Sequence, residues 1–212
     1  MAITNCAECG AEVSTDAPSC PKCGFRVGAK RIRVWQSLLL GAVAIAAAAY
    51  AFALGIARRF PEATDEARRA VEIDPGSYIS QHSLALTCNW SSDHTGAIAA
   101  AEAALAVSGR HLWALADLAT ALAASGKPGE AEAIYEELVA RSRREHVQPT
   151  WFAVTCVAVG KTDEAFSSLE RAYRDRDPYF GVSLKHWPDL DPIRGDPRFA
   201  VLVERVGLGG DP

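Results

Sequence analysis

The 212-residue sequence lacks the residue patterns of the common catalytic sites. It contains no glycine-rich loop that could cradle a phosphate group and no nucleophile-elbow serine motif of the hydrolases. Its five histidines do not have the spacing of a zinc-protease site. These absences count against nucleotide-dependent and hydrolytic chemistry. We therefore predict that the protein is not an enzyme, with no catalytic or cofactor-binding residue, and that its histidines lie at the surface or in packing positions.

Clusters of basic residues are also missing from most of the chain. Residues 60–212 hold 15 bases and 23 acids, whereas residues 1–59 hold seven bases and three acids. A phosphate backbone is bound by clustered Lys and Arg. We therefore expect no nucleic acid among the partners.

Charge is absent altogether from the segment at 34–57. A helix of this length crosses the hydrocarbon core of a bilayer. A buried soluble helix would keep a polar stripe, yet only Gln36 and Ser37 are polar here. A cleaved signal peptide would have to include a whole cysteine motif in its basic region. We therefore predict one transmembrane helix at 34–57, in contact with the lipid bilayer, after a basic linker at 29–33.

Four of the six cysteines form two pairs near the N-terminus, Cys6 with Cys9 and Cys20 with Cys23. A glycine follows each pair and lets the backbone turn so that its amides face sulfur. Two such knuckles make a closed tetrahedral site with four sulfur ligands. Because the segment is too small to hold a core, bound metal would supply most of its fold. Two disulfides are the alternative, and they would need an oxidising compartment.

Residues 6–24 resemble the short N-terminal zinc-ribbon of many bacterial membrane proteins, in which Cys-x-x-Cys-Gly and Cys-Pro-x-Cys-Gly flank a spacer. The resemblance implies a zinc-ribbon at 1–28 with structural Zn²⁺ as its cofactor, held by all four cysteines. Basic residues are nearly equal in number on the two sides of the apolar run. Thiolates persist best in a reducing cytosol, so we place the N-terminus there and residues 60 onward outside it.

The rest of the chain repeats at a constant interval, most clearly in the alanines at 63, 97, 131 and 165. Upstream of the last three, Leu84, Leu118 and Phe152 are each followed by alanine. Two helix faces thus repeat, and Gly126 and Gly160 mark the turns between them. Helix pairs of this kind stack because one pair cannot bury its apolar face alone.

This pattern resembles the tetratricopeptide repeat, and the resemblance implies a mostly α-helical helix-turn-helix solenoid at 60–178. We expect a single second helix at 61–73 and helix pairs at about 78–108, 112–144 and 147–175. Cys88 and Cys156 would be buried thiols on the inner helix faces.

The tail at 179–212 resembles the segment that closes tetratricopeptide arrays in bacterial sensory, kinase and transcription-factor proteins. It would form a cap that covers the last pair through Trp187, Phe199, Leu202 and Val203.

The resemblance implies that the solenoid binds a protein partner in its groove, with candidate groove residues on the first helices, chiefly Gln81, Leu115 and Pro149 with their neighbours. We therefore expect a membrane-anchored scaffold or adaptor for protein–protein interaction. The alternative is a regulatory membrane protein that responds to zinc or to oxidation through its ribbon.

Overall fold

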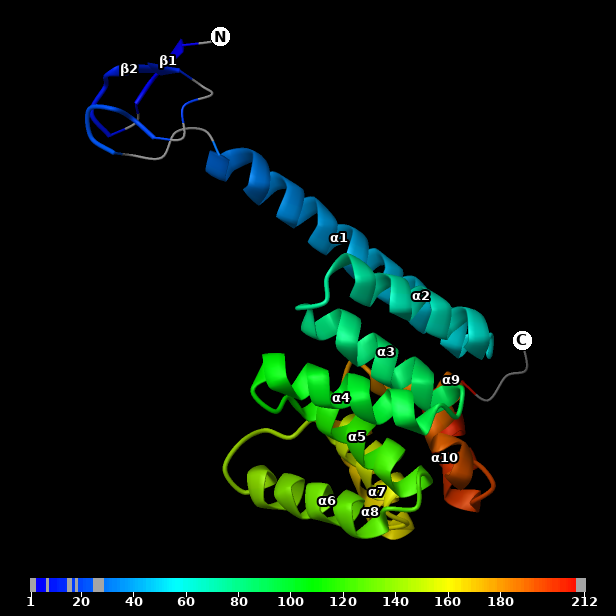
Figure 1. Cartoon of the computed structure of the whole chain (residues 1–212). Coiled ribbons are helices and arrows are strands. Elements are labelled where there is room, and N and C mark those ends of the chain that lie inside the picture. The colour runs from blue at the N-terminus through cyan, green and yellow to red at the C-terminus, as the bar shows by residue number, and fades with distance from the viewer. Residues whose placement is uncertain (1–2, 7, 15–16, 18, 25–28, 209–212) are drawn as a thin grey trace. The chain divides into compact units, whose positions relative to one another are not determined.

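The computed structural model describes the chain in two compact units, which divide between Val43 and Ala44 inside the long helix α1 (Ala29–Ile56). Figure 1 shows the elements of both units. The described residues are 3–6, 8–14, 17, 19–24 and 29–208, with the backbone alone at 29–36. The side chains of the predicted basic linker at 29–33 therefore lie outside the described part of the chain.

The N-terminal unit contains a two-stranded antiparallel sheet, β1 (Ile3–Asn5) and β2 (Glu12–Ser14). Ile3 pairs with Ser14 and Asn5 pairs with Glu12, so the first cysteine pair stands in the connection between the strands. The interior of this small unit consists of Cys6, Cys20 and Val13, each at most 4% exposed. Cysteine side chains therefore form much of this interior, which apolar side chains would fill in a larger domain.

The second unit is built from helix hairpins, and its helices lie within a few residues of the expected ranges. Its helices after α1 are α2 (Phe60–Ile73), α3 (Tyr78–Trp90), α4 (His94–Ser108), α5 (Leu112–Ala124), α6 (Pro128–Ser142), α7 (Pro149–Ala158) and α8 (Thr162–Asp175). Local signals set several of their starts. The Asp93 side chain accepts the Gly96 N–H at 3.0 Å, and proline begins α6 and α7.

The same turn joins the two helices of every hairpin. Arg58, Ser92, Gly126 and Gly160 occupy its left-handed position, with φ between 61° and 81°. The N–H that follows each of them donates to a carbonyl oxygen five residues earlier, at 2.8–2.9 Å. This is the hydrogen bond that commonly closes a helix C-terminus. Four equal turns, placed at the constant interval of the repeat, therefore show four hairpins.

The second half of α1, residues 44–56, is the first helix of the first hairpin. Its Ala51 is fully buried, as is Ala85 one period later. The lack of a side chain at Gly55 makes room for Trp90, because a Cβ there would lie 2.1 Å from the Trp90 ring. The sequence analysis left α2 without a partner helix, and the structure supplies one. The array therefore begins within the segment predicted to span a bilayer.

Alanine lets the paired helices approach closely. The alanines of the repeat are 0% exposed, as are most of their neighbours on the same helix faces: Ala63, Ala67, Ala70, Ala97, Ala101, Ala104, Ala131, Ala165 and Ala172. Because the helices pack so closely, the larger side chains occupy the spaces between successive hairpins and beneath the cap.

The C-terminal cap consists of α9 (Phe180–His186), the 3₁₀ helix η1 (Pro188–Ile193) and α10 (Pro197–Arg205). It packs on α7 and α8. Trp187, Phe199 and Leu202 are at most 4% exposed, and Val203 packs on the same core at its edge. These residues cover the face of the last hairpin that the sequence analysis expected them to cover.

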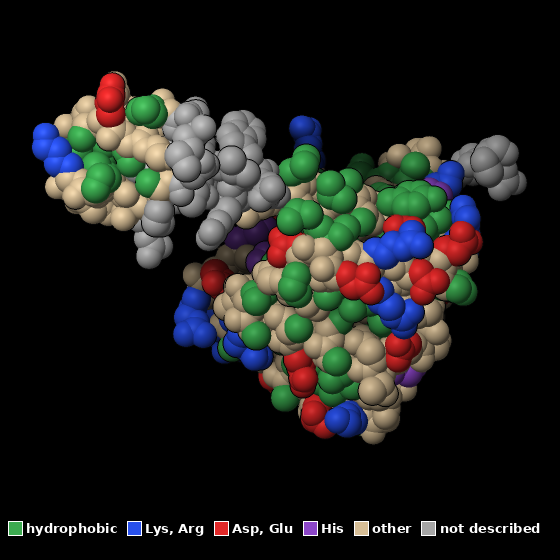
Figure 2. Space-filling model, turned by 45° about the horizontal axis from the view of Figure 1, so that its top comes forward, with side chains coloured by type: hydrophobic (Ala, Val, Ile, Leu, Met, Phe, Trp, Pro, Cys, Tyr) green, Lys and Arg blue, Asp and Glu red, His purple; other side chains and the backbone are tan. Residues whose placement is uncertain are grey.

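Charged side chains of both signs are interspersed on the surface of the array. Figure 2 shows Lys and Arg side chains next to Asp and Glu side chains on the face in view. Over the array as a whole, oppositely charged side chains form exposed ion pairs, as Arg68 does with Asp65 at 3.1 Å and Arg110 with Glu137 at 2.5 Å. Exposed pairs of this kind contribute little to stability. They do mean that this face carries no large field of a single sign.

Candidate functional site

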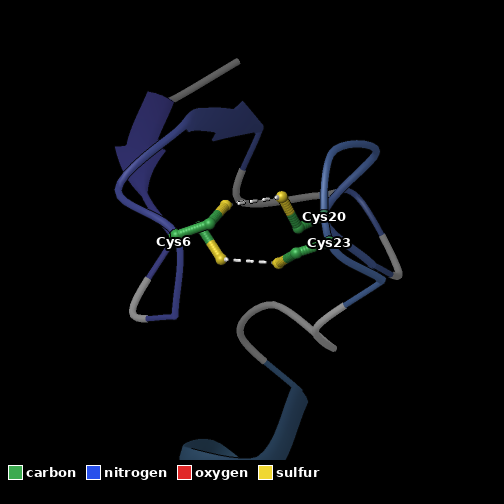
Figure 3. A group of neighbouring side chains, drawn as sticks. Cys6, Cys20 and Cys23 are labelled. Carbon is green, nitrogen blue, oxygen red and sulfur yellow. Dashed lines mark hydrogen bonds between the residues drawn. The ribbon is translucent and has the colours of Figure 1, made fainter.

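The four N-terminal cysteines come together in the first unit (Figure 3). Cys6 follows β1 directly, Cys9 stands in the turn before β2, and the other pair comes from the second knuckle. All four Sγ atoms lie within 4.8 Å of one another. The Sγ atoms of Cys6 and Cys23 are 3.5 Å apart, and those of Cys9 and Cys20 are 3.7 Å apart.

These separations fit a tetrahedral metal centre. Zn–S bonds of about 2.3 Å place tetrahedral sulfur ligands about 3.8 Å apart. A disulfide would need an S–S distance of about 2.05 Å, far shorter than either separation. The donor set suits Zn²⁺, and four sulfur ligands complete its coordination, so the centre has the chemistry of a structural site.

A glycine shapes the backbone of each knuckle. Gly10 and Gly24 have φ values of 69° and 75°, and their N–H groups donate to the carbonyl oxygens of Cys6 and Cys20. The pKa of Cys20 is lowered to about 7, chiefly because the backbone N–H of Lys22 donates to its sulfur. Amides that face sulfur stabilise the thiolate, which is the form that binds a metal.

In the array, the first helices of successive hairpins share one face, called the inner face here. α5 packs against both α3 and α7 on this face. Two cavities open on it, and the smaller has a volume of about 230 Å³ and mainly apolar walls. Residues at the same register position of successive first helices line this cavity. One such set is Ile45, Ile79 and Trp113, which follow one another at the interval of the repeat.

Aromatic rings form most of the inner face around this smaller cavity. The rings of Trp113 and Trp151 stack with centroids 5.5 Å apart, and Tyr179 approaches Trp113 edge-on at 5.2 Å. Trp187 packs edge-on against Trp151 at 4.6 Å. Trp113 and Tyr179 are half-buried, whereas the two other tryptophans are at most 2% exposed. A buried pair of rings thus supports a half-buried pair, an arrangement that suits the anchoring of another side chain.

A buried polar pair lies beside these rings. His82 Nδ1 and Asp117 Oδ2 are 2.6 Å apart, and the Asp117 side chain is 1% exposed. Burial raises the pKa of Asp117, and the neighbouring His82 acts in the opposite direction. The Asn89 side-chain amide also donates to the Asp117 carbonyl oxygen at 2.9 Å. The pair ties α3 to α5, and because the His82 ring contacts Trp113 and Trp151 it also holds the aromatic wall in place.

The prediction placed the groove on the first helices, chiefly at Gln81, Leu115 and Pro149 with their neighbours. The three named residues line neither cavity, so the prediction is wrong for them, whereas the neighbour His82 lines the smaller cavity. Leu115 is fully buried in the core, and Pro149 is buried at the start of α7. Gln81 is 9% exposed and donates its amide to the Pro75 carbonyl oxygen. Nearby positions in the helices, such as His82 and Trp113, form the wall instead. Large aromatic residues in alanine-rich helices were the sequence signal that could have identified it.

Cys88 and Cys156 are buried thiols, as predicted. They are at most 1% exposed, and burial is the main cause that raises the pKa of Cys88 to about 11 and that of Cys156 to about 12. Protonated, enclosed thiols of this kind are unreactive packing groups.

Comparison with known proteins agrees with this architecture. Residues 91–148 match the tetratricopeptide repeat family model, and residues 5–27 match the zinc-ribbon domain model. A solved chain from the functional characterization of Pseudomonas aeruginosa PilF is 19% identical, with a TM-score of 0.48, over 81% of this chain and 79% of that chain. No curated protein matches the chain. The two family matches and the helix hairpins thus show a zinc-ribbon sequence followed by a tetratricopeptide-like helical solenoid.

Proposed function

We propose that this protein is a membrane-anchored scaffold that binds a segment of a partner protein along the inner face of its array. The observation that supports partner binding is the pair of half-buried rings, Trp113 and Tyr179, which line the smaller cavity and pack on buried neighbours. An extended segment would lie across the first helices and place one or two anchor side chains against these rings. The mechanism is recognition without a chemical step.

The test of partner binding uses peptides selected from a random displayed library on the full-length protein. Trp113→Ala should weaken the selected peptides by about 30-fold or more, as expected for loss of an aromatic anchor. Val107→Ala is the matched control, because Val107 lies on the second helix α4 and is 51% exposed. Equal binding by the two variants would place recognition away from the inner face.

Membrane attachment rests on the apolar helix. Ser37–Ile56 is a 20-residue stretch with a mean hydropathy of 2.2. In the part of it that precedes the array, Leu38, Leu39 and Leu40 are 52–66% exposed. Such a run of exposed leucines is unfavourable in water, and a bilayer would cover it. We infer that residues 34–57 cross the membrane, with the ribbon in the cytosol and the array outside it.

A complete span and the docked first hairpin use the same residues. When residues 44–56 are docked, only residues 34–43 remain, and ten helical residues extend about 15 Å. The hydrocarbon core is about 30 Å thick. In a full span, residues 44–56 would leave the array and expose the surfaces of α2 and α3 that they cover. The two arrangements therefore exclude each other. The structure describes the docked one. In the spanning one, Ile45 and Phe52 would leave the wall of the smaller cavity, whereas Trp113, Tyr179 and the residues that line the larger cavity would stay in the array.

Cysteine labelling in membranes tests this inference. Tyr50 is 54% exposed in the docked hairpin, and it would lie in lipid in the spanning helix. Cys88 and Cys156 are replaced by alanine to remove background thiols. In permeabilised cells, Tyr50→Cys should be protected from a water-soluble maleimide, whereas the exposed Ser125→Cys should react. Equal labelling of both positions would show that the helix stays docked and does not span.

The same reagent determines orientation in intact cells. A maleimide that cannot cross membranes should label Ser125→Cys, and it should label the exposed Thr4→Cys only after lysis. The opposite result would invert the topology and move the search for partners into the cytosol.

A second function is a zinc- or redox-responsive role of the ribbon, and the exposure of Cys23 at the metal centre supports it. An oxidant can reach an exposed thiolate more readily than a buried one. A chromogenic zinc indicator would report metal release during mild peroxide treatment. Retention of zinc under those conditions would leave the ribbon with a structural role alone.

A further inference from the structure

The larger cavity of the inner face lies where the C-terminal cap meets the ends of the first helices. Its volume is about 460 Å³. Its walls are largely apolar and include Phe60, Trp90 and Val154, while η1 contributes two carboxylates, Asp189 and Asp191. The cavity thus combines an apolar lining with acidic groups, which is the environment that suits a flexible apolar stem with a charged end.

The two carboxylates of η1 differ in how they are neutralised. Asp191 accepts two hydrogen bonds from Arg58, at 2.5 and 2.8 Å, and one from Arg194 at 2.6 Å. Asp189 accepts the indole N–H of Trp90 at 2.7 Å. Among the described residues, no Lys or Arg forms an ion pair with Asp189. Asp191 is therefore in contact with two cationic side chains, whereas the donor to Asp189 is the neutral indole of Trp90.

Asn89, a residue of the cavity wall, holds a second acceptor, and this acceptor is buried. The residue is 9% exposed and lines the cavity wall. Its side-chain nitrogen donates to the Asp117 carbonyl oxygen at 2.9 Å, which fixes the orientation of the amide. Within the described part of the chain, its side-chain oxygen, Oδ1, has no hydrogen-bond donor. A buried amide oxygen without a donor is unfavourable, so a bound donor would be stabilised here.

We propose that this cavity, called the cap pocket, receives a lysine side chain of the bound partner segment. The aliphatic stem would pack on the apolar walls, and the ammonium group would donate to Asp189 and to Asn89 Oδ1. This inference rests on the proposed function, because it assigns one anchor of the same inner face. It adds a preference for a lysine side chain in the partner segment, which the aromatic rings alone do not determine.

The geometry favours lysine over arginine. A guanidinium group binds a carboxylate best through two parallel hydrogen bonds, which need both oxygens. Trp90 already donates to Oδ2 of Asp189, so a guanidinium group that used both oxygens would have to share Oδ2 with the indole N–H. An ammonium group has three donors that point in different directions, so it can bond one oxygen of Asp189 and also reach a separate amide oxygen.

The electrostatic environment of Asp189 in the cap pocket favours the binding of a cation. Burial raises the pKa of Asp189 to about 6, and the acids Asp117 and Asp191 act in the same direction, while the Trp90 N–H acts against them. Arg58 lines the pocket, and it is held by Asp191. An ammonium group bound at Asp189 would offset this unfavourable environment.

The test uses n-butylammonium as the probe and n-butanol, which has the same stem without charge, as its control. The full-length protein with zinc is studied in detergent micelles, and the indole N–H resonance of Trp90 is followed by NMR. n-Butylammonium should shift this resonance in a saturable way, and its dissociation constant should be lower than that of n-butylguanidinium. n-Butanol should cause no saturable shift. An equal response to the ammonium and the alcohol would overturn the proposal.

Substitutions provide the second arm of the test. Asp189→Asn removes the charge and keeps an acceptor for Trp90, and it should weaken n-butylammonium binding at least about tenfold. Asp175→Asn is the matched control, because that exposed acid at the end of α8 does not line the cap pocket and should leave binding unchanged. Unchanged affinity in Asp189→Asn would also overturn the proposal.

The outcomes for the cap pocket and for the proposed function are separable. Selected peptides that need Trp113 but bind Asp189→Asn normally would keep the scaffold and refute the cap pocket. Saturable n-butylammonium binding that depends on Asp189 would support the cap pocket even if no selected peptide used Trp113.

Discussion

In the ribbon part of the N-terminal unit, Cys6, Val13 and Cys20 form the buried interior, and two three-residue strands are the regular structure among its described residues. In the array, stacked hairpins bury alanines at the helix contacts and large aromatic and aliphatic side chains between hairpins. The ribbon is too short to bury enough apolar surface, so we expect it to depend on metal coordination. The second depends on repetition, because each hairpin covers the next.

Removal of zinc is expected to have the largest effect, and only on the N-terminal unit. Structural zinc contributes about 10–16 kcal/mol in comparable peptides. A chelator should therefore abolish the dispersed NMR signals of residues 3–24 and leave those of the array in place. Loss of array signals at the same chelator concentration would show that the two units are not independent.

Truncation of a side chain in the core of the array should destabilise the array and leave the N-terminal unit unchanged. Leu115 is fully buried, so Leu115→Ala should lower the free energy of unfolding by about 2–5 kcal/mol in urea denaturation. Zinc affinity should not change. Val201→Ala is the control, because Val201 is 51% exposed and its truncation should cost less than about 0.5 kcal/mol. Equal losses in the two variants would contradict the assigned core.

The first hairpin can be tested apart from the others. A methyl group at Gly55 would collide with Trp90, so Gly55→Ala should destabilise the array by about 1–3 kcal/mol. Gly129→Ala is the matched helical control, since a Cβ at Gly129 meets no atom within 4 Å. It should be neutral or stabilising by up to about 1 kcal/mol. Gly55→Ala without any loss of stability would mean that residues 44–56 are not docked in solution.

The smallest expected effect concerns the shared turn. Ser92 has a φ of 63°, whereas Gly126 and Gly160 hold the same position in later hairpins. Ser92→Gly should therefore stabilise the array by about 0.5–1 kcal/mol, because glycine adopts this conformation without strain. Thermal unfolding would measure the gain. A loss of stability would show that the Ser92 side chain contributes more than its backbone strain costs.

The local signals in the sequence predicted much of this fold. The cysteine pairs indicated the metal centre, and the regular alanine period located the helices from α2 to α8. The same period also continues into the apolar run, where Tyr50 and Ala51 stand one interval before Leu84 and Ala85. Hydropathy concealed this signal, since an apolar helix that spans a bilayer and one that starts an alanine-rich array have nearly the same composition.

The groove was harder to predict for a geometric reason. A shift of one residue turns a helix by about 100°, so Gln81 is buried toward α2 while its neighbour His82 lines the smaller cavity. A single sequence shows the repeat period of the helices more precisely than it shows which side of each helix faces the groove. The identities of the groove residues therefore depended on how the hairpins stack.

The sequence by itself determined the features that depend on local spacing: the cysteine knuckles, the hairpin period, the turn positions and the apolar helix. Only the tertiary structure decided which residues meet across long separations. Trp90 and Asp189 are far apart in the chain, and they form one wall of the cap pocket because the cap folds back onto the first helices. Short-range spacing follows from backbone geometry, whereas such a meeting depends on the packing of every hairpin between the two residues.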